Sequence, residues 1–142
     1  MNKKRVFVDS DVVISSLISA KGAAYLLLNN QKEKFIISNI SKKEIKEVAD
    51  RLKISQDRLR DLIKSRLKIA NLETDLAKIK KDFKDFASDP NDTHIVAGAV
   101  RARAKFLLTY NTKHFNKHKI SEELGINVLT PGQYLQYLRS LG

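Results

Sequence analysis

Short apolar runs alternate along the chain with longer segments in which apolar residues recur at helical spacing. Runs with the residue types of buried strands lie at residues 5–8, 35–38, 106–109 and 126–129, and a weaker one lies at residues 69–72. Helices are predicted at residues 23–30, 41–52, 55–70, 74–83, 89–104 and 131–141. Strands that alternate with helices are typical of a parallel sheet covered on both faces. We therefore predict an α/β fold with three α/β/α layers, in which residues 1–142 form one domain.

Acidic residues stand close to the junctions between these strands and helices. Asp9 directly follows a Val-Phe-Val strand, where a carboxylate is unfavourable unless something compensates its charge. Glu44 is predicted at position N3 of a helix capped by Ser41, and Asp92 at N3 of a helix capped by Asp89. A carboxylate at N3 can accept a hydrogen bond from an unpaired backbone N–H and contributes about 0.5 to 1 kcal/mol. Either residue alone is therefore explained as a helix cap.

The three acids are nevertheless expected to meet in space. The carboxyl ends of parallel strands gather at one edge of a sheet, so Asp9, Glu44 and Asp92 should lie close together. Crowded carboxylates repel one another unless a divalent cation neutralises their charge. Taken together, the acids indicate a metal-assisted catalytic site rather than three independent caps.

Composition narrows the substrate and the compartment. The chain has 142 residues, 42% of them hydrophobic, and a net charge of +11. An acidic pocket on a basic protein suits an enzyme that acts on a polyanion, and nucleic acid is the commonest one. Basic residues flank two of the acidic motifs, at Lys42, Lys43, Lys46 and Lys113. The absence of cysteine excludes disulfides and thiolate zinc sites, and no apolar stretch approaches a membrane span, so we expect a cytoplasmic protein that enters no membrane.

The acidic motifs also resemble those of a known family. Residues 6–15, 41–45, 89–92 and 107–115 are similar, in this order, to the motifs of PIN-domain nucleases. The first of these segments is an apolar strand that ends in Asp9-Ser10-Asp11 and continues into an apolar helix. The resemblance spans nearly the whole chain and is greatest to the PIN toxins of prokaryotic type II toxin-antitoxin pairs.

This resemblance implies a metal-dependent endoribonuclease. Asp9, Glu44 and Asp92 would be the catalytic residues and would hold Mg²⁺ or Mn²⁺, which activates water for hydrolysis of an RNA phosphodiester. Ser10 and Thr109 would orient the carboxylates. The implied partners are RNA, a small antitoxin protein and a second copy of the chain in a homodimer.

Two positions depart from the family pattern. Asp11 stands where Asn is frequent, and Asn111 stands where many members carry a fourth acid. Asn111 keeps an oxygen that could touch metal-bound water, but it lacks the negative charge of an acid. This leaves open whether one or two metals bind, and Asp11 could partly offset the lost charge.

The sequence is also compatible with other functions. The Asp9 to Asp11 motif also resembles the nucleophile motif of haloacid-dehalogenase phosphatases, in which Asp9 would attack phosphorus and Asp11 would transfer protons. A module that binds RNA without cleaving it is a third interpretation. The histidines carry less weight: His94 is expected near the rim of the site, and His114 and His118 lie in a lysine-rich segment that we predict to be irregular, which argues against zinc.

Overall fold

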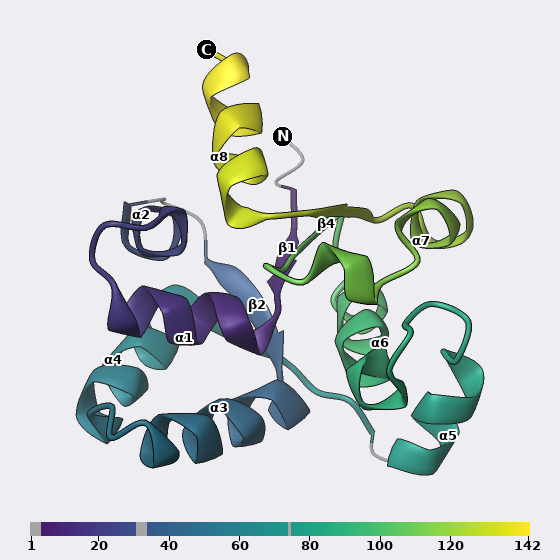
Figure 1. Cartoon of the computed structure of the whole chain (residues 1–142), viewed down its shortest axis with the longest axis horizontal. Helices are drawn as coiled ribbons and strands as arrows, with labels where there is room; N and C mark the ends of the chain where they lie inside the picture. Colours follow the sequence, from purple (N-terminus) through teal and green to yellow (C-terminus); the bar gives the residue numbers. More distant parts are fainter. Residues whose placement is uncertain (1–3, 31–33, 74) are drawn as a thin grey trace.

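A parallel five-stranded sheet forms the middle of the protein, with helices on both of its faces (Figure 1). The computed structural model describes residues 4–30, 34–73 and 75–142. The strands lie in the order β3-β2-β1-β4-β5. They are β1 (Val6–Val8), β2 (Phe35–Ser38), β3 (Leu67–Ala70), β4 (Phe106–Leu108) and β5 (Asn127–Leu129). The helices are α1 (Ser10–Ile18), α2 (Ala23–Asn30), α3 (Asn39–Arg51), α4 (Gln56–Arg66), α5 (Leu76–Asp82), α6 (Thr93–Arg101), α7 (Lys117–Leu124) and α8 (Pro131–Ser140), with 3-10 turns η1 (Pro90–Asp92) and η2 (Thr112–His114).

Alternate strand residues supply two hydrophobic cores, because successive side chains of a strand point to opposite faces. Val6 and Val8 of β1 join a core that includes residues of α1 to α4 and of α8. Phe7 joins the other core, with residues of α6 and α7. Helix α5 packs against α6 on this second face. The predicted three-layer α/β/α fold with a parallel sheet is therefore confirmed.

Strand β3 corrects the helix that the sequence predicts at residues 55–70. Helix α4 ends at Arg66, and the next four residues form an edge strand in which Leu67 pairs with Phe35 of β2. Leu67 continues the helical spacing of Leu59 and Ile63, so the apolar pattern alone favours a longer helix. Pairing with the open edge of β2 outweighs that local preference.

Helix α7 replaces a segment that the sequence predicts to be irregular. Asn116 caps it by accepting a hydrogen bond from the backbone N–H of Lys119, and Ile120 is fully buried. Gly125, with a φ of 67°, ends the helix in the left-handed conformation. The lysine-rich stretch is thus the outer face of an amphipathic helix. The helix predicted at residues 74–83 is α5, and Thr74 lies outside the described residues.

A glycine allows α6 to lie close to the central strand. A Cβ atom at Gly98 would lie 2.5 Å from Cζ of the buried Phe7 ring, which is closer than two carbon atoms can approach. Helix α6 therefore contacts β1 through Gly98, and this contact fixes the start of α6 relative to the end of β1.

Within the described ranges, no single helix has the length and hydropathy of a membrane span. Only the bent pair of α1 and α2 passes that test, by length and composition when the two are taken together.

Candidate active site

The candidate site lies at the carboxyl ends of the two central strands, β1 and β4. The chain leaves β1 towards β2 on one side and reaches β4 on the other, so a crevice is expected between the ends of these strands. Asp9 follows β1, and Thr109 follows β4. The backbone N–H of Asp9 donates to the carbonyl of Leu108 over 2.9 Å, which continues the pairing of the strands up to the site.

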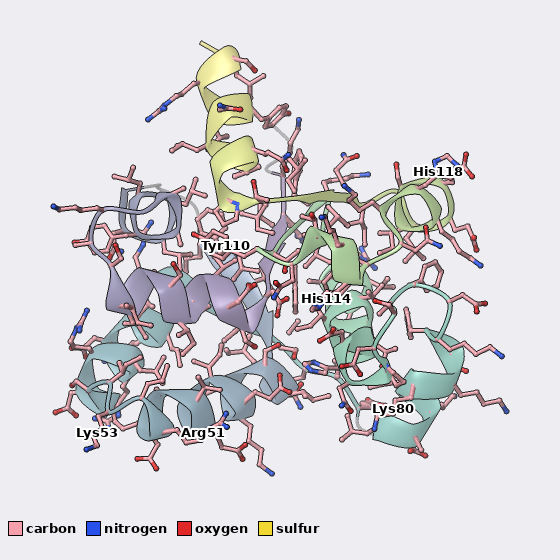
Figure 2. All side chains as sticks on the ribbon, viewed as in Figure 1. Arg51, Lys53, Lys80, Tyr110, His114 and His118 are labelled. Carbon is pink, nitrogen blue, oxygen red and sulfur yellow. The ribbon has the colours of Figure 1, made fainter. Side chains whose placement is uncertain are left out.

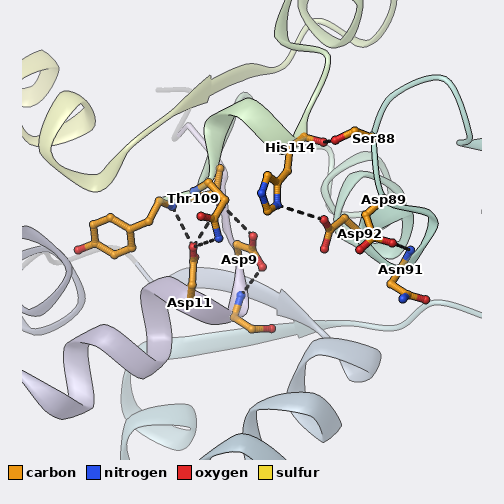
Figure 3. A network of polar contacts seen from close by, with 11 residues as sticks. Asp9, Asp11, Ser88, Asp89, Asn91, Asp92, Thr109 and His114 are labelled. Carbon is orange, nitrogen blue, oxygen red and sulfur yellow. Dashed lines mark hydrogen bonds and ion pairs between the residues drawn. The ribbon is translucent and has the colours of Figure 1, made fainter.

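Two hydrogen bonds fix the Asp9 carboxylate (Figure 3). The Ser10 backbone N–H donates to Oδ1 over 2.7 Å, and the Thr109 hydroxyl donates to Oδ2 over 2.9 Å. The pKa of Asp9 is raised to about 7, mainly by burial and also by the neighbouring charge of Asp11. The two hydrogen bonds lower the pKa, but they do not offset these causes. An acid held in this state is unfavourable for the fold at neutral pH and indicates a functional position.

Asp11 lies beside Asp9 and shares a donor with it. Its Oδ2 accepts from the Tyr110 backbone N–H over 3.0 Å, from Asn111 Nδ2 over 3.3 Å and from the Thr109 hydroxyl over 3.5 Å. Its Oδ1 is buried and has no hydrogen-bond partner among the described residues. Burial is the main cause that raises the pKa of Asp11. An unpaired oxygen on a buried carboxylate is the kind of atom that a cation can coordinate.

Neither Glu44 nor Asp92 acts as the helix cap that the sequence predicts. Helix α3 begins at Asn39, with Ser38 as its N-cap, so Glu44 lies in the second turn rather than at N3. Asp92 ends η1 and precedes α6, and its side chain makes no capping hydrogen bond. The predicted N3 position of Glu44 is therefore wrong, because α3 starts earlier than the sequence pattern indicates. Asp92 does lie at N3 of η1, which Asp89 caps as predicted, but its side chain caps no helix. The alternative explanation of these two acids as helix caps therefore does not hold.

Each of these two acids instead contacts a histidine. His94 Nε2 lies 3.0 Å from Glu44 Oε1, and His114 Nδ1 lies 3.6 Å from Asp92 Oδ2. Ser88 holds the segment that carries His114, because its backbone N–H and its hydroxyl both donate to the His114 carbonyl, over 2.9 and 3.0 Å (Figure 3). Burial and the neighbouring charge of Asp89 raise the pKa of Asp92, while the two histidines lower it.

The four acids belong to one electrostatic cluster, although they do not yet surround a single point. The charge of Asp92 raises the pKa of both Asp9 and Asp11, and the charge of Glu44 raises that of Asp92. In this arrangement, no three of the described His, Asp or Glu side chains stand close enough to hold a metal ion together. The donor set of carboxylate oxygens, including the unpaired Oδ1 of Asp11, fits a hard cation such as Mg²⁺ or Mn²⁺.

The supporting residues reach the acids in different ways. Thr109 contacts both Asp9 and Asp11 through its buried hydroxyl. Ser10 contacts Asp9 through its backbone N–H, whereas its hydroxyl is buried without a hydrogen-bond partner among the described residues. Asn111 donates to Asp11 and so supports that carboxylate. Of the flanking lysines, Lys43, Lys46 and Lys113 are exposed and Lys42 is half-buried.

The histidine contacts are the part of the site that sequence reasoning missed. His94 is expected at the rim, but it is only 6% exposed. The signal in the sequence is the apolar run at residues 95–97 directly after His94, and in the structure residues 93–99 of this helix are all buried. His118 contacts Glu122 within α7, and His114 faces Asp92. Figure 2 shows these two histidines on different elements.

An open parallel α/β sheet with clustered acids where β1 and β4 end defines the class of this protein. Residues 5–113 match the family model described as PIN domain, and the chain belongs to that family. Of the two families that the Asp9 to Asp11 motif resembles, PIN is thus the one that the chain matches. No curated protein sequence matches the chain.

Solved structures with the same fold include a chain of a toxin-antitoxin complex and chains of two complexes bound to DNA. A chain of a toxin-antitoxin complex from Klebsiella pneumoniae is 25% identical, with a TM-score of 0.60 over 89% of this chain and 97% of that chain. A chain of VapBC2 from Rickettsia felis, bound to a DNA fragment from its promoter, is 16% identical, with a TM-score of 0.56 over 87% of this chain and 96% of that one. A chain of FitAB bound to an IR36 DNA fragment is 17% identical, with a TM-score of 0.58 over 89% and 94%. The last two likenesses concern the fold alone.

Proposed function

We propose that the protein is a divalent-metal-dependent endoribonuclease of PIN type and the toxin of a toxin-antitoxin pair. The observation that carries this proposal is the cluster of Asp9, Asp11, Glu44 and Asp92 between β1 and the start of α6, in which burial and mutual repulsion raise the pKa of three of the acids. Repulsion within such a cluster destabilises the fold when no cation is bound, and the same carboxylates can bind a divalent cation for catalysis.

In the proposed mechanism, Asp9, Glu44 and Asp92 hold Mg²⁺ or Mn²⁺. The bound ion would lower the pKa of a water molecule and stabilise the negative charge that develops on the phosphate. Thr109 keeps the Asp9 carboxylate in place through its 2.9 Å hydrogen bond. Asn111 steadies Asp11 through its own hydrogen bond.

The proposed substrate is RNA, drawn to the site by positive charge. The chain carries a net charge of +11, and the exposed lysines Lys43, Lys46 and Lys113 flank the acidic residues on α3 and η2. A phosphate backbone approaching the acids would contact these side chains. Binding by lysines should weaken steeply as the salt concentration rises.

A partner protein that covers the acids would protect the host cell in the cytoplasm. An arginine suits this task because its planar fork can bridge two carboxylates and take the place of the cation. A cavity of about 290 Å³ between α1, α2 and α4, lined by apolar residues such as Leu17 and Leu62 and by the charged residues Arg58 and Asp61, would receive a side chain with an apolar stem and a polar end from a helix of the same partner. A homodimer is proposed from the family resemblance, and light scattering of the purified protein would test it.

The experiment that tests the function is incubation of the purified protein with a mixed RNA pool, with and without Mn²⁺, followed by sequencing of the fragment ends. Mn²⁺-dependent fragments that are absent with Asp9→Asn would support the proposal. Salt-sensitive RNA binding without cleavage would favour a non-cleaving RNA-binding module instead. An aspartyl-phosphate formed at Asp9 would favour phosphatase chemistry.

The toxin assignment has its own test. Expression of the chain alone should be toxic, and a small protein encoded beside it should co-purify and compete with Mn²⁺ for the site. Harmless expression without any such partner would overturn the toxin assignment and leave the nuclease assignment standing.

A further inference from the structure

Buried His94 joins the two helices that carry Glu44 and Asp92. It is the second residue of α6 and follows Asp92 by two positions, so its backbone is fixed to that of one proposed metal ligand. Its Nε2 lies 3.0 Å from Oε1 of Glu44 on α3. The imidazole is 8% exposed, whereas the Glu44 side chain is 46% exposed. A buried group therefore holds one oxygen of a carboxylate whose side chain is half-exposed.

The assignment of the proton follows from the partners of the ring. Nε2 faces a carboxylate oxygen, so a neutral imidazole must carry its proton there to make the contact favourable. Nδ1 is buried without a hydrogen-bond partner among the described residues. A carboxylate has two oxygens, so the contact at Oε1 leaves Oε2 for a cation. The arrangement matches the way in which outer groups orient metal-binding carboxylates in other proteins.

Helix α6 is itself fixed to the central strand, which extends the connection to Asp9. Gly98 lies one helical turn after His94 and on the same side of the helix. The Phe7 ring occupies the space of the missing Cβ at Gly98, and Phe7 lies two residues before Asp9. The end of β1, the start of α6 and the second turn of α3 are thus linked through Gly98 and His94.

We infer that His94 is a positioning residue that holds Glu44 in register with Asp9 and Asp92 for metal binding. This inference rests on the proposed function, because Glu44 is a metal ligand only in that proposal. His94 touches neither substrate nor the reacting atoms. Its role depends on the hydrogen bond to Glu44 and on the reach of the imidazole, not on a change of protonation.

The test measures Mn²⁺ affinity by titration calorimetry with four variants. His94→Leu removes the donor and should weaken Mn²⁺ binding about tenfold or more, as the loss of an outer group does in other metal sites. His94→Gln keeps an N–H donor at a similar reach to Nε2 and should restore much of the affinity, whereas the shorter His94→Asn should not. His118→Gln is the matched control, because His118 also contacts a glutamate, Glu122, but lies 83% exposed on α7.

The glutamine and asparagine variants are alike in polarity, so they keep the test decisive if His94→Leu does not fold. In a Glu44→Gln background, exchange of His94 for leucine should have no further effect on Mn²⁺ affinity, because the coupled group is already changed. Unchanged or tighter Mn²⁺ binding by His94→Leu, or equal affinities of the glutamine and asparagine variants, would overturn the inference. Failure of the wild-type protein to bind Mn²⁺ would overturn the proposed function and the inference with it.

Discussion

The substitution Asp9→Asn should stabilise the metal-free protein at neutral pH and abolish cleavage. In the folded protein the pKa of Asp9 is raised from 3.8 to about 7, so the fold favours the protonated form. The free energy of unfolding therefore falls as the pH rises from about 4 to about 7, because in this range the unfolded chain has lost the Asp9 proton that the folded protein still holds. At about 1.4 kcal/mol for each pKa unit, the upper limit of this loss is about 4 kcal/mol.

Asparagine avoids the buried charge but keeps only part of the hydrogen bonding. Its single oxygen can accept from Ser10 or Thr109, and the other donor then faces an amide group at a penalty of about 1 to 2 kcal/mol. A net gain of about 2 kcal/mol at pH 8 follows, which corresponds to a rise in Tm of about 6 °C for a domain of this size. At pH 4 the gain should vanish, because Asp9 of the wild-type protein is then protonated as well.

Thermal melts of wild type and Asp9→Asn in EDTA, at pH values between 4 and 8, would measure this difference. Asp50→Asn on the exposed side of α3 is the control for replacing an ordinary surface carboxylate. A variant that melts below wild type at pH 8, or a difference in Tm that does not change with pH, would refute the reasoning and assign Asp9 a mainly structural role.

Three further substitutions test other parts of the structure. Asn111→Asp should tighten Mn²⁺ binding in calorimetry and lower the Tm of the metal-free protein, because it replaces a donor to Asp11 by a negative charge; unchanged affinity would put position 111 beyond reach of the metal. Lys53→Gly should raise the free energy of unfolding in urea by about 0.5 to 1 kcal/mol, since Lys53 has a φ of 57° after α3; a loss of stability would contradict this. Gly98→Ala should lower that free energy by about 1 to 3 kcal/mol, because the new Cβ would overlap the Phe7 ring; a neutral result would mean that the ring moves at little cost.

Much of the fold could be predicted because its signals are local. The run from Val6 to Val8 is short, apolar and rich in β-branched residues, which favours a buried strand. The predicted boundaries of β2 and α2 agree with the structure. The capping box between Thr130 and Gln133 starts α8 as its sequence indicates. Strand β3 is different, because its pairing with β2 joins residues far apart in the chain and competes with a helical pattern that continues to Leu67. The local pattern therefore predicts only a weaker strand at residues 69–72, two residues later than β3 begins.

The site could be predicted only as far as a set of acids at one edge of the sheet. The gathering of carboxylates follows from the positions of strand ends, which apolar runs reveal. The contacts of Glu44 with His94 and of Asp92 with His114 depend on where α3 and α6 begin. Helix α3 begins a few residues earlier than expected, at Asn39, and a shift of that size changes the face of the helix on which a side chain lies. The segment before α6 begins at Pro90 as expected, but as a 3-10 turn that ends at Asp92.

The raised pKa of Asp9 also connects the proposed chemistry with the proposed partner. A cation binds the deprotonated carboxylate, so below about pH 7 metal binding would release a proton from Asp9 and become weaker as the pH falls. The fold of the metal-free protein is least stable in the same neutral pH range in which the metal binds best. An arginine from a partner would relieve the same repulsion among Asp9, Asp11 and Asp92 without supplying an activated water. Partner and metal would therefore both gain binding free energy by relieving the same charge repulsion. Each should raise the Tm of the free protein, but adding one should not raise the Tm of the complex with the other.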